Sequence, residues 1–359
     1  MEKTLEYIEE NVFLFMTLSA KRILIPSGAG APGFAGILEC LKEREDLMVI
    51  AGDINSKAYG AALADDFFIN WPSDNDDYIK TISKKIQEES IGIILPITTR
   101  ELYPLSLNKE KLTELGATVI ISSHKAIQLA NDKGATWNYA KSIGVNTPDG
   151  VVVSTINHWE DAVTRILATG KNACFKPIYG NGMRGFGIVE KEQSGNFWNE
   201  KSGILPLNQL EWKNRLISNW YQPLLVSEFL PGKEYSVDVI INKQEVKRIA
   251  VRTRDKMIGG ISVQGTYVQH QQIEEMTIKL VTGIGLDGPV GVQWREDKNG
   301  IPKLLEINPR LQGTTSASRV AGVNIPLESV LISIGEDVDF SRKIQIGASF
   351  SRYWKDISL

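Results

Sequence analysis

The stretch LLEINPR, residues 304–310, sets three polar side chains at the end of an apolar strand. On an extended chain, residues two apart point to the same face, so Glu306 and Asn308 share one face. Pro309 stops the strand, and Arg310 follows it directly. A carboxylate, an amide and a guanidinium therefore meet at one edge, which a plain polar strand end does not easily explain.

Gln293, in the stretch GVQW at 291–294, lies on the preceding strand, and the turn EDKNG at 296–300 joins the two. Adjacent antiparallel strands would bring the oxygens of Gln293, Glu306 and Asn308 together. A hard cation such as Mg²⁺ binds carboxylate and amide oxygens and shares them with nucleotide phosphates. The pattern predicts a site for Mg²⁺, with Mn²⁺ as a substitute, and it places Arg310 near a phosphate or a developing oxyanion.

A second pattern, FKPIYGNGMRGFGIV at 175–189, puts Lys176 inside a strand ahead of a glycine-rich loop. Glycines such as Gly182 and Gly185 let backbone N–H groups wrap around phosphate oxygens. The pattern is typical of a phosphate clamp with a flexible lid. A hairpin with a glycine-rich tip and a solvated lysine remains the alternative.

The stretch LLVSEFLPGKEYSVDV, residues 224–239, ends an apolar strand at Glu228 and returns through a Pro-Gly turn to Glu234. The backbone around Phe229 and Leu230 has the form of an adenine-binding segment, with Glu228 accepting from the exocyclic amine. Glu234 is placed for the ribose hydroxyls. The alternative is that both glutamates are solvated at a turn.

Near the N-terminus, GAGAPG at 28–33 fits the dinucleotide-binding fingerprint, with Asp53 at the end of the next strand. The same glycines also suit a tight strand-to-helix turn whose helix N-terminus holds any anion. Pro32 stiffens this turn, and the second set of phosphate-binding residues is richer. Both interpretations stay open on this motif alone.

Length and composition limit the possible domain organisation, partners and location of the protein. The chain has 359 residues and a net charge of −3, so we expect two or three domains and no nucleic-acid partner. Cys40 and Cys174 are far apart, which fits a reducing cytoplasm. The short apolar run at 12–18 follows glutamates and does not resemble a signal peptide, so residues 1–20 are interpreted as an amphipathic helix or extension. No stretch approaches a membrane span.

Periodicity predicts an α/β part followed by an α+β part. Strands at 22–26, 47–54, 65–72, 91–97 and 117–123 alternate with helices at 37–44 and 76–89, which indicates a parallel sheet covered on both faces. A helix at 132–144 follows. After it, long strands with turn signals indicate a mostly antiparallel sheet, and 192–208 has the composition of an exposed loop.

Lys133, Lys176, the glycine loop, EFLPGKE, Gln293 and EINPR occur in the order and spacing of ATP-grasp enzymes, and the chain resembles the carbamoyl-phosphate synthetase large-subunit branch over residues 21–335. The resemblance implies an N-terminal extension (1–20), a Rossmann-like domain (21–125) that lines the acceptor side without binding NAD, one ATP-grasp domain (126–335) with a lid at about 146–225, and a C-terminal tail (336–359). Here Asn181 and Met183 replace serines that the family often carries in the loop.

Carried over to this sequence, the resemblance implies that Lys133 and Lys176 bind ATP phosphates and that Glu228, Phe229, Leu230 and Glu234 hold adenosine. Gln293, Glu306 and Asn308 would ligate magnesium, and Arg310 would stabilise the transferred group. Gly30 would lie on the acceptor side.

We therefore expect an ATP-dependent carboxylate–amine or carboxylate–thiol ligase that acts on a small-molecule acid through an acyl phosphate.

Arg252 and Arg254 alternate on one strand and share a face, where they would clamp a substrate carboxylate or phosphates, or simply be solvated. An NAD-dependent oxidoreductase and a nucleotide-binding protein without turnover are the alternatives. A homodimer is a further expectation.

Overall fold

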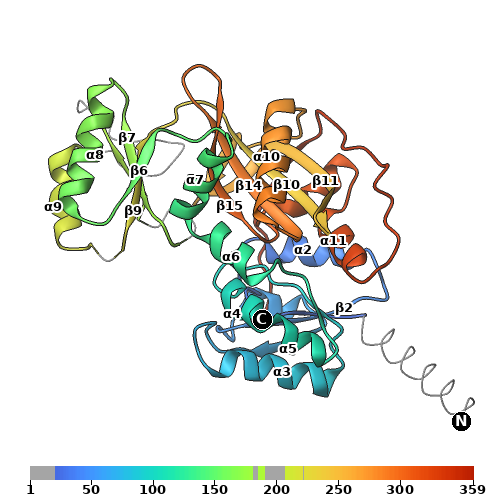
Figure 1. Cartoon of the computed structure of the whole chain (residues 1–359). Coiled ribbons are helices and arrows are strands. Elements are labelled where there is room, and N and C mark those ends of the chain that lie inside the picture. The colour runs from blue at the N-terminus through green and yellow to red at the C-terminus, as the bar shows by residue number, and fades with distance from the viewer. Residues whose placement is uncertain (1–20, 181–184, 191–206, 221) are drawn as a thin grey trace, which may run out of the picture.

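The computed structural model describes residues 21–180, 185–190, 207–220 and 222–359. Its N-terminal part (blue to teal in Figure 1) lies beside a central antiparallel sheet, from which a smaller lid subdomain (green to yellow) projects. The predicted extension at 1–20, Gly182 and most of the predicted loop at 192–208 lie outside the described residues.

The N-terminal sheet is parallel, with strand order β3-β2-β1-β4-β5, as predicted. Its strands are β1 (Arg22–Ile25), β2 (Met48–Asp53), β3 (Asp66–Ile69), β4 (Ile93–Ile94) and β5 (Thr118–Val119). Successive side chains of β1 point to opposite faces, so Ile23 and Ile25 pack with helix α2 (Phe34–Leu41). Leu24 packs on the other side with α3 (Asp77–Glu89). Both faces of the sheet are therefore covered.

Several element boundaries differ from the prediction: β3 stops at Ile69 and β5 at Val119, where strands to 72 and 123 were predicted. Helix α2 begins at Phe34, three residues before the predicted start, because Phe34 N bonds Ala31 O directly after the glycine turn. Strand β4 stops at Ile94, although a strand to residue 97 was predicted. The N–H groups of Ile97 and Thr98 donate to the Glu101 carboxylate instead of to a neighbouring strand, at 2.8 and 2.6 Å.

Short helices connect the sheet to the rest of the chain. After α4 (Leu102–Leu107) and α5 (Lys109–Glu114) come α6 (His124–Asn131) and α7 (Lys133–Ser142). Ser123 caps α6, and Asp132 caps α7 by accepting from Ala135 N at 2.8 Å. The cap fixes Lys133 as the first residue of α7, where its side chain reaches the lid.

The lid is an antiparallel sheet of order β6-β9-β7-β8. Its elements are β6 (Gly150–Val153), α8 (Ile156–Ala168), β7 (Ala173–Pro177), β8 (Gly187–Val189), α9 (Gln209–Ile217) and β9 (Leu224–Glu228). The two helices cover one face (Figure 1), where Trp159, Phe175 and Trp212 pack edge to face. The opposite face is turned toward the central sheet, since Trp137 of α7 packs with Ile178 and Leu225 there.

The central sheet has order β11-β10-β14-β15 and is antiparallel throughout. Its strands are β10 (Glu234–Asn242), β11 (Glu245–Thr253), β14 (Gly288–Glu296) and β15 (Pro302–Asn308), and the helices α10 (Gln271–Ile284) and α11 (Ile325–Ser333) pack on it. The mostly antiparallel second half is as predicted. Strands β14 and β15, which carry the predicted metal ligands, are direct neighbours.

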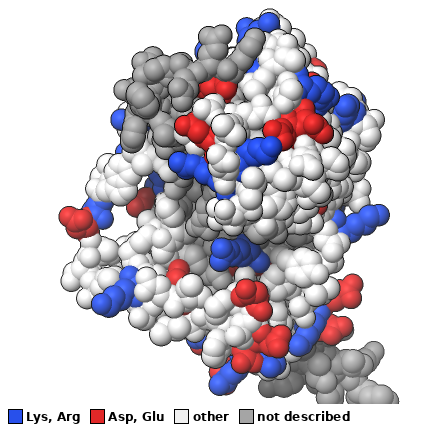
Figure 2. Space-filling model, turned by 90° about the vertical axis from the view of Figure 1, so that its left-hand side faces the viewer, with Lys and Arg blue, Asp and Glu red and all other residues white. Residues whose placement is uncertain are grey.

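The C-terminal segment is not a free tail. Strand β16 (Ser349–Ser351) pairs with β13 (Ile261–Thr266), which also pairs with β12 (Lys256–Ile258). On the lid-side face in Figure 2, basic and acidic side chains are interspersed. In the described part of the chain, none of the helices combines the length and hydropathy of a membrane span.

Candidate active site

The three predicted metal ligands lie on one face of the β14–β15 pair. Gln293 is directly opposite Glu306, and Asn308 is opposite Gly291. Asn308 Nδ2 donates to Glu306 Oε1 at 3.1 Å. One carboxylate and two amides on one face form an oxygen-rich set that fits a hard cation such as Mg²⁺. Among the described residues no group of three His, Cys, Asp or Glu side chains could hold a metal.

A β-bulge separates this site from the rest of β15. The register of β14 and β15 shifts between Gln293 and Trp294, so that Leu305 is the extra residue. Its carbonyl accepts a hydrogen bond from Lys176 Nζ at 2.6 Å. The bulge therefore lets a lysine of lid strand β7 bond the backbone beside Glu306.

Lys133 and Lys176 approach the same carboxylate from two different elements. Lys133 Nζ donates to Gly180 O of the glycine-rich segment. Burial lowers the pKa of Lys176, whereas Glu306 opposes that shift. Burial alone would raise the pKa of Glu306, but Lys133 and Lys176, with Asn308 and Arg254, lower it. Glu306 is therefore held as an anion at the centre of a cationic group.

A cavity lies between the lid and the central sheet at this point. Its wall combines Lys133, Lys176 and Glu306 with apolar side chains that include Trp137, Leu225 and Leu304. The cavity has room for about one water molecule, so in this conformation it marks where these charged and apolar groups meet and not a space for a nucleotide.

Glu228 has a different environment from the predicted one. Its carboxylate accepts from Lys171 Nζ at 2.5 Å, Lys303 Nζ at 2.6 Å and Asp149 N at 3.0 Å. Burial would raise its pKa, but these hydrogen bonds lower it to about 2. Both oxygens already accept from protein donors, so a contact of this side chain with an adenine amine would be added to these bonds and stays a prediction. Through Lys303, Glu228 also joins the lid to β15.

Glu234 and Phe229 lie in a second charged group. Glu234 Oε1 is 3.0 Å from Arg254 Nε, and its Oε2 is 3.7 Å from Arg295 Nη1. The Arg295 guanidinium lies 5.0 Å from the centre of the Phe229 ring. Leu230, the residue after Phe229, is buried. Phe229 and Glu234 of the predicted adenosine segment therefore meet through Arg295, and the carboxylate of Glu234 is paired with arginines.

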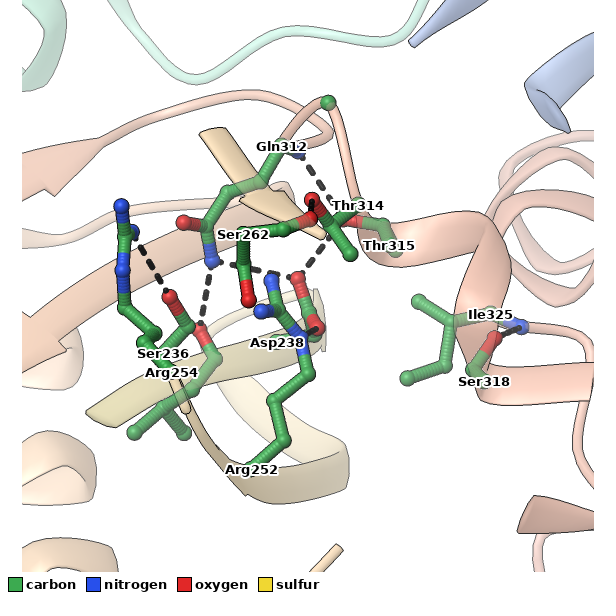
Figure 3. Close-up of polar contacts among 12 residues, drawn as sticks. Ser236, Asp238, Arg252, Arg254, Ser262, Gln312, Thr314, Thr315, Ser318 and Ile325 are labelled. Carbon is green, nitrogen blue, oxygen red and sulfur yellow. Dashed lines mark hydrogen bonds and ion pairs between the residues drawn. The ribbon is translucent and has the colours of Figure 1, made fainter. Parts of the chain in front are cut away.

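Arg252 and Arg254 share a face, but their surroundings differ (Figure 3). Arg252 is 1% exposed, and its Nε lies 3.0 Å from Asp238 Oδ2. It is buried in this ion pair, so its role as a clamp stays a prediction that the geometry does not favour. Arg254 donates to Ser236 Oγ at 3.2 Å and to Gly260 O at 2.6 Å, and Glu306 acts on its charge. Arg254 remains a candidate for substrate or phosphate.

Arg310 joins the two halves of the molecule. Its Nε donates to Thr99 Oγ1 of the N-terminal domain at 3.0 Å, and its Nη2 donates to Asn308 Oδ1 at 3.3 Å. Burial lowers its pKa, with Glu306 and Glu101 acting against that shift. The predicted catalytic guanidinium is therefore held at the junction by contacts on both sides.

Glu101 was not singled out from the sequence. It is fully buried two residues after Thr99, and it accepts hydrogen bonds from Tyr78 Oη at 3.0 Å and from the N–H groups of Ile97 and Thr98. Burial raises its pKa to about 7 despite these bonds. A carboxylate shortly after a strand end, in PITTRE at 96–101, was the available signal.

The first glycine motif does not form an open turn. Asp53 Oδ2 accepts from Gly30 N at 2.9 Å. A Cβ at Gly33 would lie 2.6 Å from the Cα of Gly313, so the loop after Arg310 packs directly on the start of α2. Arg352 covers both loops by donating to Pro32 O and Gly313 O at 2.5 and 2.9 Å. The end of the motif at Gly33 is therefore covered by protein, whereas Gly30 stays exposed.

Comparisons with known proteins show what the chain is similar to. Residues 221–351 match the family described as ATP-grasp in the biosynthetic pathway with Ter operon, and residues 28–120 match the PylC-like N-terminal domain. Over 280 residues the chain is 23% identical to the carbamoyl phosphate synthase large chain of Clostridium botulinum (strain Loch Maree / Type A3). That alignment covers 75% of this chain and 24% of the relative, so the chain spans about a quarter of its length.

Solved structures share the fold at low identity. The biotin carboxylase domain of Hydrogenobacter thermophilus 2-oxoglutarate carboxylase, a dimer in complex with MgADP and bicarbonate, superposes with a TM-score of 0.68 at 20% identity, covering 92% of this chain and 73% of that one. The N5-carboxyaminoimidazole synthetase of Staphylococcus aureus complexed with ADP gives 0.66 at 17% identity, covering 89% and 78%.

The L-amino acid ligase of Bacillus licheniformis gives a TM-score of 0.67 at 14% identity, covering 88% of this chain and 74% of that one. The family matches and the shared fold confirm the predicted resemblance, a single ATP-grasp unit behind a parallel-sheet domain.

Proposed function

We propose that this ATP-grasp chain is an ATP-dependent ligase that joins a small-molecule carboxylate to an amine or a thiol. The carrying observation is the face shared by Gln293, Glu306 and Asn308, onto which lid residue Lys176 is brought by its bond to Leu305 O at 2.6 Å. An anionic, oxygen-rich face beside lysines suits a metal-bound triphosphate.

In this proposal Lys133 and Lys176 bind the phosphates, and the backbone of the glycine-rich segment, including Gly182 and Gly185, wraps around them. Gln293, Glu306 and Asn308 hold Mg²⁺, for which Mn²⁺ is a chemically similar substitute. When bound, the cation neutralises charge that builds on the phosphates during transfer. The chain's own part is to orient the triphosphate, exclude water with the lid and present the cationic side chains.

We propose the junction of the two halves as the site of the acceptor acid. Arg310 lies there between Thr99 and Asn308, and Arg254 and the exposed Gly30 are further candidates for contact with the acid. A carboxylate oxygen attacks the γ-phosphorus and ADP leaves, which forms an acyl phosphate. The amine nitrogen or thiol sulfur then attacks the carbonyl carbon, inorganic phosphate leaves, and the nucleophile loses its proton.

The two alternatives lack comparable support. An oxidoreductase would need the first glycine turn open for a dinucleotide, but Gly313 and Arg352 cover it. A nucleotide-binding protein without turnover would have no need for Glu306 held as an anion between two lysines. Among the relatives, the amino acid ligase and the N5-carboxyaminoimidazole synthetase are synthetic enzymes by name.

The proposed partners are the small acid and the nucleophile. Nucleic acid is not among them, since the net charge is −3 and charges of both signs are interspersed on the face in Figure 2. A homodimer is proposed from the dimeric relative, and a cytoplasmic location from the two unpaired cysteines, Cys40 and Cys174.

A screen of acid and nucleophile pairs tests the proposal. We expect ADP and phosphate to form in equal amounts only when both members of the right pair are present with Mg-ATP. With ¹⁸O in the carboxylate of the acid, one labelled oxygen should appear in the released phosphate. Phosphate without label would exclude the acyl phosphate, and turnover that needs no acid would exclude the ligase.

A further inference from the structure

A buried polar network lies beside the candidate metal ligands, on the same face of the central sheet. Asp238, Arg252, Gln312 and Thr315 are each at most 5% exposed. Figure 3 shows them gathered around the Asp238 carboxylate, which accepts from Arg252 Nε at 3.0 Å and Thr315 Oγ1 at 2.7 Å. All four side chains are buried, so their hydrogen bonds act on other groups of the protein.

Gln312 occupies a place that the sheet leaves open for it. A Cβ at Gly291 would lie 2.1 Å from Gln312 Cγ and 2.4 Å from its Nε2. The side chain therefore lies against the bare backbone of β14, two residues before Gln293. Its own backbone N donates to Thr315 Oγ1 at 2.9 Å, which fixes the start of the side chain.

The partners of Gln312 set which way its amide points. Nε2 donates to Val237 O at 3.2 Å and to Asp238 Oδ1 at 3.1 Å. A backbone carbonyl and a carboxylate paired with an arginine can only accept, so the NH₂ end must face them. The carbonyl end, Oε1, therefore faces away from Asp238.

Gln293 meets that carbonyl end. Its Nε2 donates to Gln312 Oε1 at 3.4 Å. Because Oε1 of Gln312 cannot donate, Gln293 must offer its NH₂ group, and its own carbonyl oxygen is left for the face that it shares with Glu306 and Asn308. If the Gln293 amide were turned around, it would present its NH₂ group to the cation. An amide NH₂ group does not bind metals.

We propose that Gln312 is a positioning residue that orients the Gln293 amide so that its oxygen faces the metal ion. The Asp238 carboxylate, paired with Arg252, accepts from Gln312, and Gln312 in turn accepts from Gln293. The buried charge therefore determines the orientation of both amides. This inference rests on the proposed function, in which Gln293 is a metal ligand. It also predicts that a glutamate at 293 needs no such orientation, because both of its ends are oxygen.

The test measures metal affinity directly. Full-length protein is saturated with a non-hydrolysable ATP analogue, and Mn²⁺ binding is followed by electron paramagnetic resonance of the free ion. We expect Gln312→Met to weaken Mn²⁺ binding about 10- to 100-fold, the range for residues that orient metal ligands. Binding of the analogue in EDTA should stay unchanged. In the Gln293→Glu background, Gln312→Met should change Mn²⁺ affinity by less than about 3-fold, since no amide remains to be turned.

Thr277→Val is the matched control. Thr277 Oγ1 accepts from Trp294 Nε1 at 3.0 Å on the other face of β14, so the variant also loses a buried hydrogen bond of this strand. Its Mn²⁺ affinity should equal that of the wild type. If Gln312→Met does not fold, Gln312→Asn keeps an amide near Asp238 and withdraws the oxygen from Gln293, with the same expected loss.

The outcomes separate two failures. A wild-type protein that binds no Mn²⁺ with the analogue would reject the proposed function itself. Tight wild-type binding that Gln312→Met leaves unchanged, or that it weakens equally with Gln or Glu at 293, would reject the orienting role alone. Loss in the Gln293 background, with recovery in the Gln293→Glu background, supports it.

Discussion

Glu306 is a carboxylate whose charge is maintained by its neighbours. Lys133, Lys176 and Arg254 act on it, and Asn308 donates to it at 3.1 Å. Such a residue contributes to function through its charge, because a buried anion without these partners would be costly to the folded state. Substitution of Glu306 tests the proposed metal site, and substitution of Glu101 tests the effect of a buried carboxyl group on stability.

Glu306→Gln should abolish Mg²⁺-dependent ADP release and leave the fold intact. The amide keeps the shape but removes the negative charge opposite Gln293. Since a bound metal contributes several kcal/mol of charge stabilisation, we expect a loss of about 100-fold or more. Acceptor-dependent ADP release and the melting temperature would be measured for both proteins. Turnover at the wild-type rate would show that LLEINPR is not the metal site.

Glu101→Gln should make stability less dependent on pH. The pKa of Glu101 is raised from 4.5 to about 7 by burial. Between these values the unfolded chain releases the proton and the folded protein retains it, so wild-type stability falls as pH rises through this window and is constant beyond it. The glutamine can still accept from Ile97 and Thr98 and donate to Tyr78.

The measurement for Glu101 is the free energy of unfolding at several pH values from 4 to 8. The difference between variant and wild type should grow in favour of the variant from about pH 4.5 to about pH 7 and then level off. A difference that is the same at every pH would show that Glu101 has an ordinary pKa.

At the scale of elements, the site depends on two contacts between loops and strands that are distant in sequence. The bulge of β15 at Leu305 meets Lys176 of β7, and the loop after β15 meets the glycine turn before α2. In the first contact a lid strand is joined to the central sheet, and in the second the N-terminal domain is joined to it. The contact at Leu305 depends on the Lys176 donor, and the contact at Gly33 leaves no space for a Cβ atom.

Gly33→Ala should destabilise the protein, because its Cβ would lie 2.6 Å from the Cα of Gly313 and the two backbones must separate. Overpacking of this kind costs about 1–3 kcal/mol. Gly30→Ala is the control in the same motif, since its Cβ would meet nothing closer than 3.5 Å. Urea unfolding of the three proteins gives the comparison. Equal stability of Gly33→Ala and wild type would mean that the loops are not in contact in solution.

At the scale of the whole molecule, the candidate site is built by three parts of the chain. The central sheet carries the metal face, the lid and α7 carry the lysines, and the N-terminal domain holds Arg310 through Thr99. A ligand that contacts all three parts stabilises the entire folded protein through mass action.

Mg-ATP should therefore raise the melting temperature, and NAD(H) should not. At 100 times its dissociation constant a ligand adds about 2.7 kcal/mol to the free energy of unfolding. EDTA should reduce the shift with ATP, because the metal face then holds no cation. Thermal unfolding with each ligand is sufficient to decide. A shift with NAD(H) and none with Mg-ATP would favour the oxidoreductase.

Much of this architecture follows from local sequence. Spacing of two along a strand determines that Glu306 and Asn308 share a face, and one turn between two strands determines that Gln293 lies opposite them. The alternation of strands and helices determined the parallel sheet, and the helix at 77–89 was visible in its apolar spacing. These features depend on residues close in sequence, whose geometry the backbone dictates.

The rest was decided only by tertiary packing. The partners of Glu228 lie 57 and 75 residues away, Arg310 meets Thr99 across 211 residues, and Arg252 is buried by an ion pair with Asp238. A glutamate or arginine on a strand has the same local pattern whether it is solvated, paired or bound to ligand. Which state it adopts depends on the charges that distant elements bring to it and on the water that their packing removes.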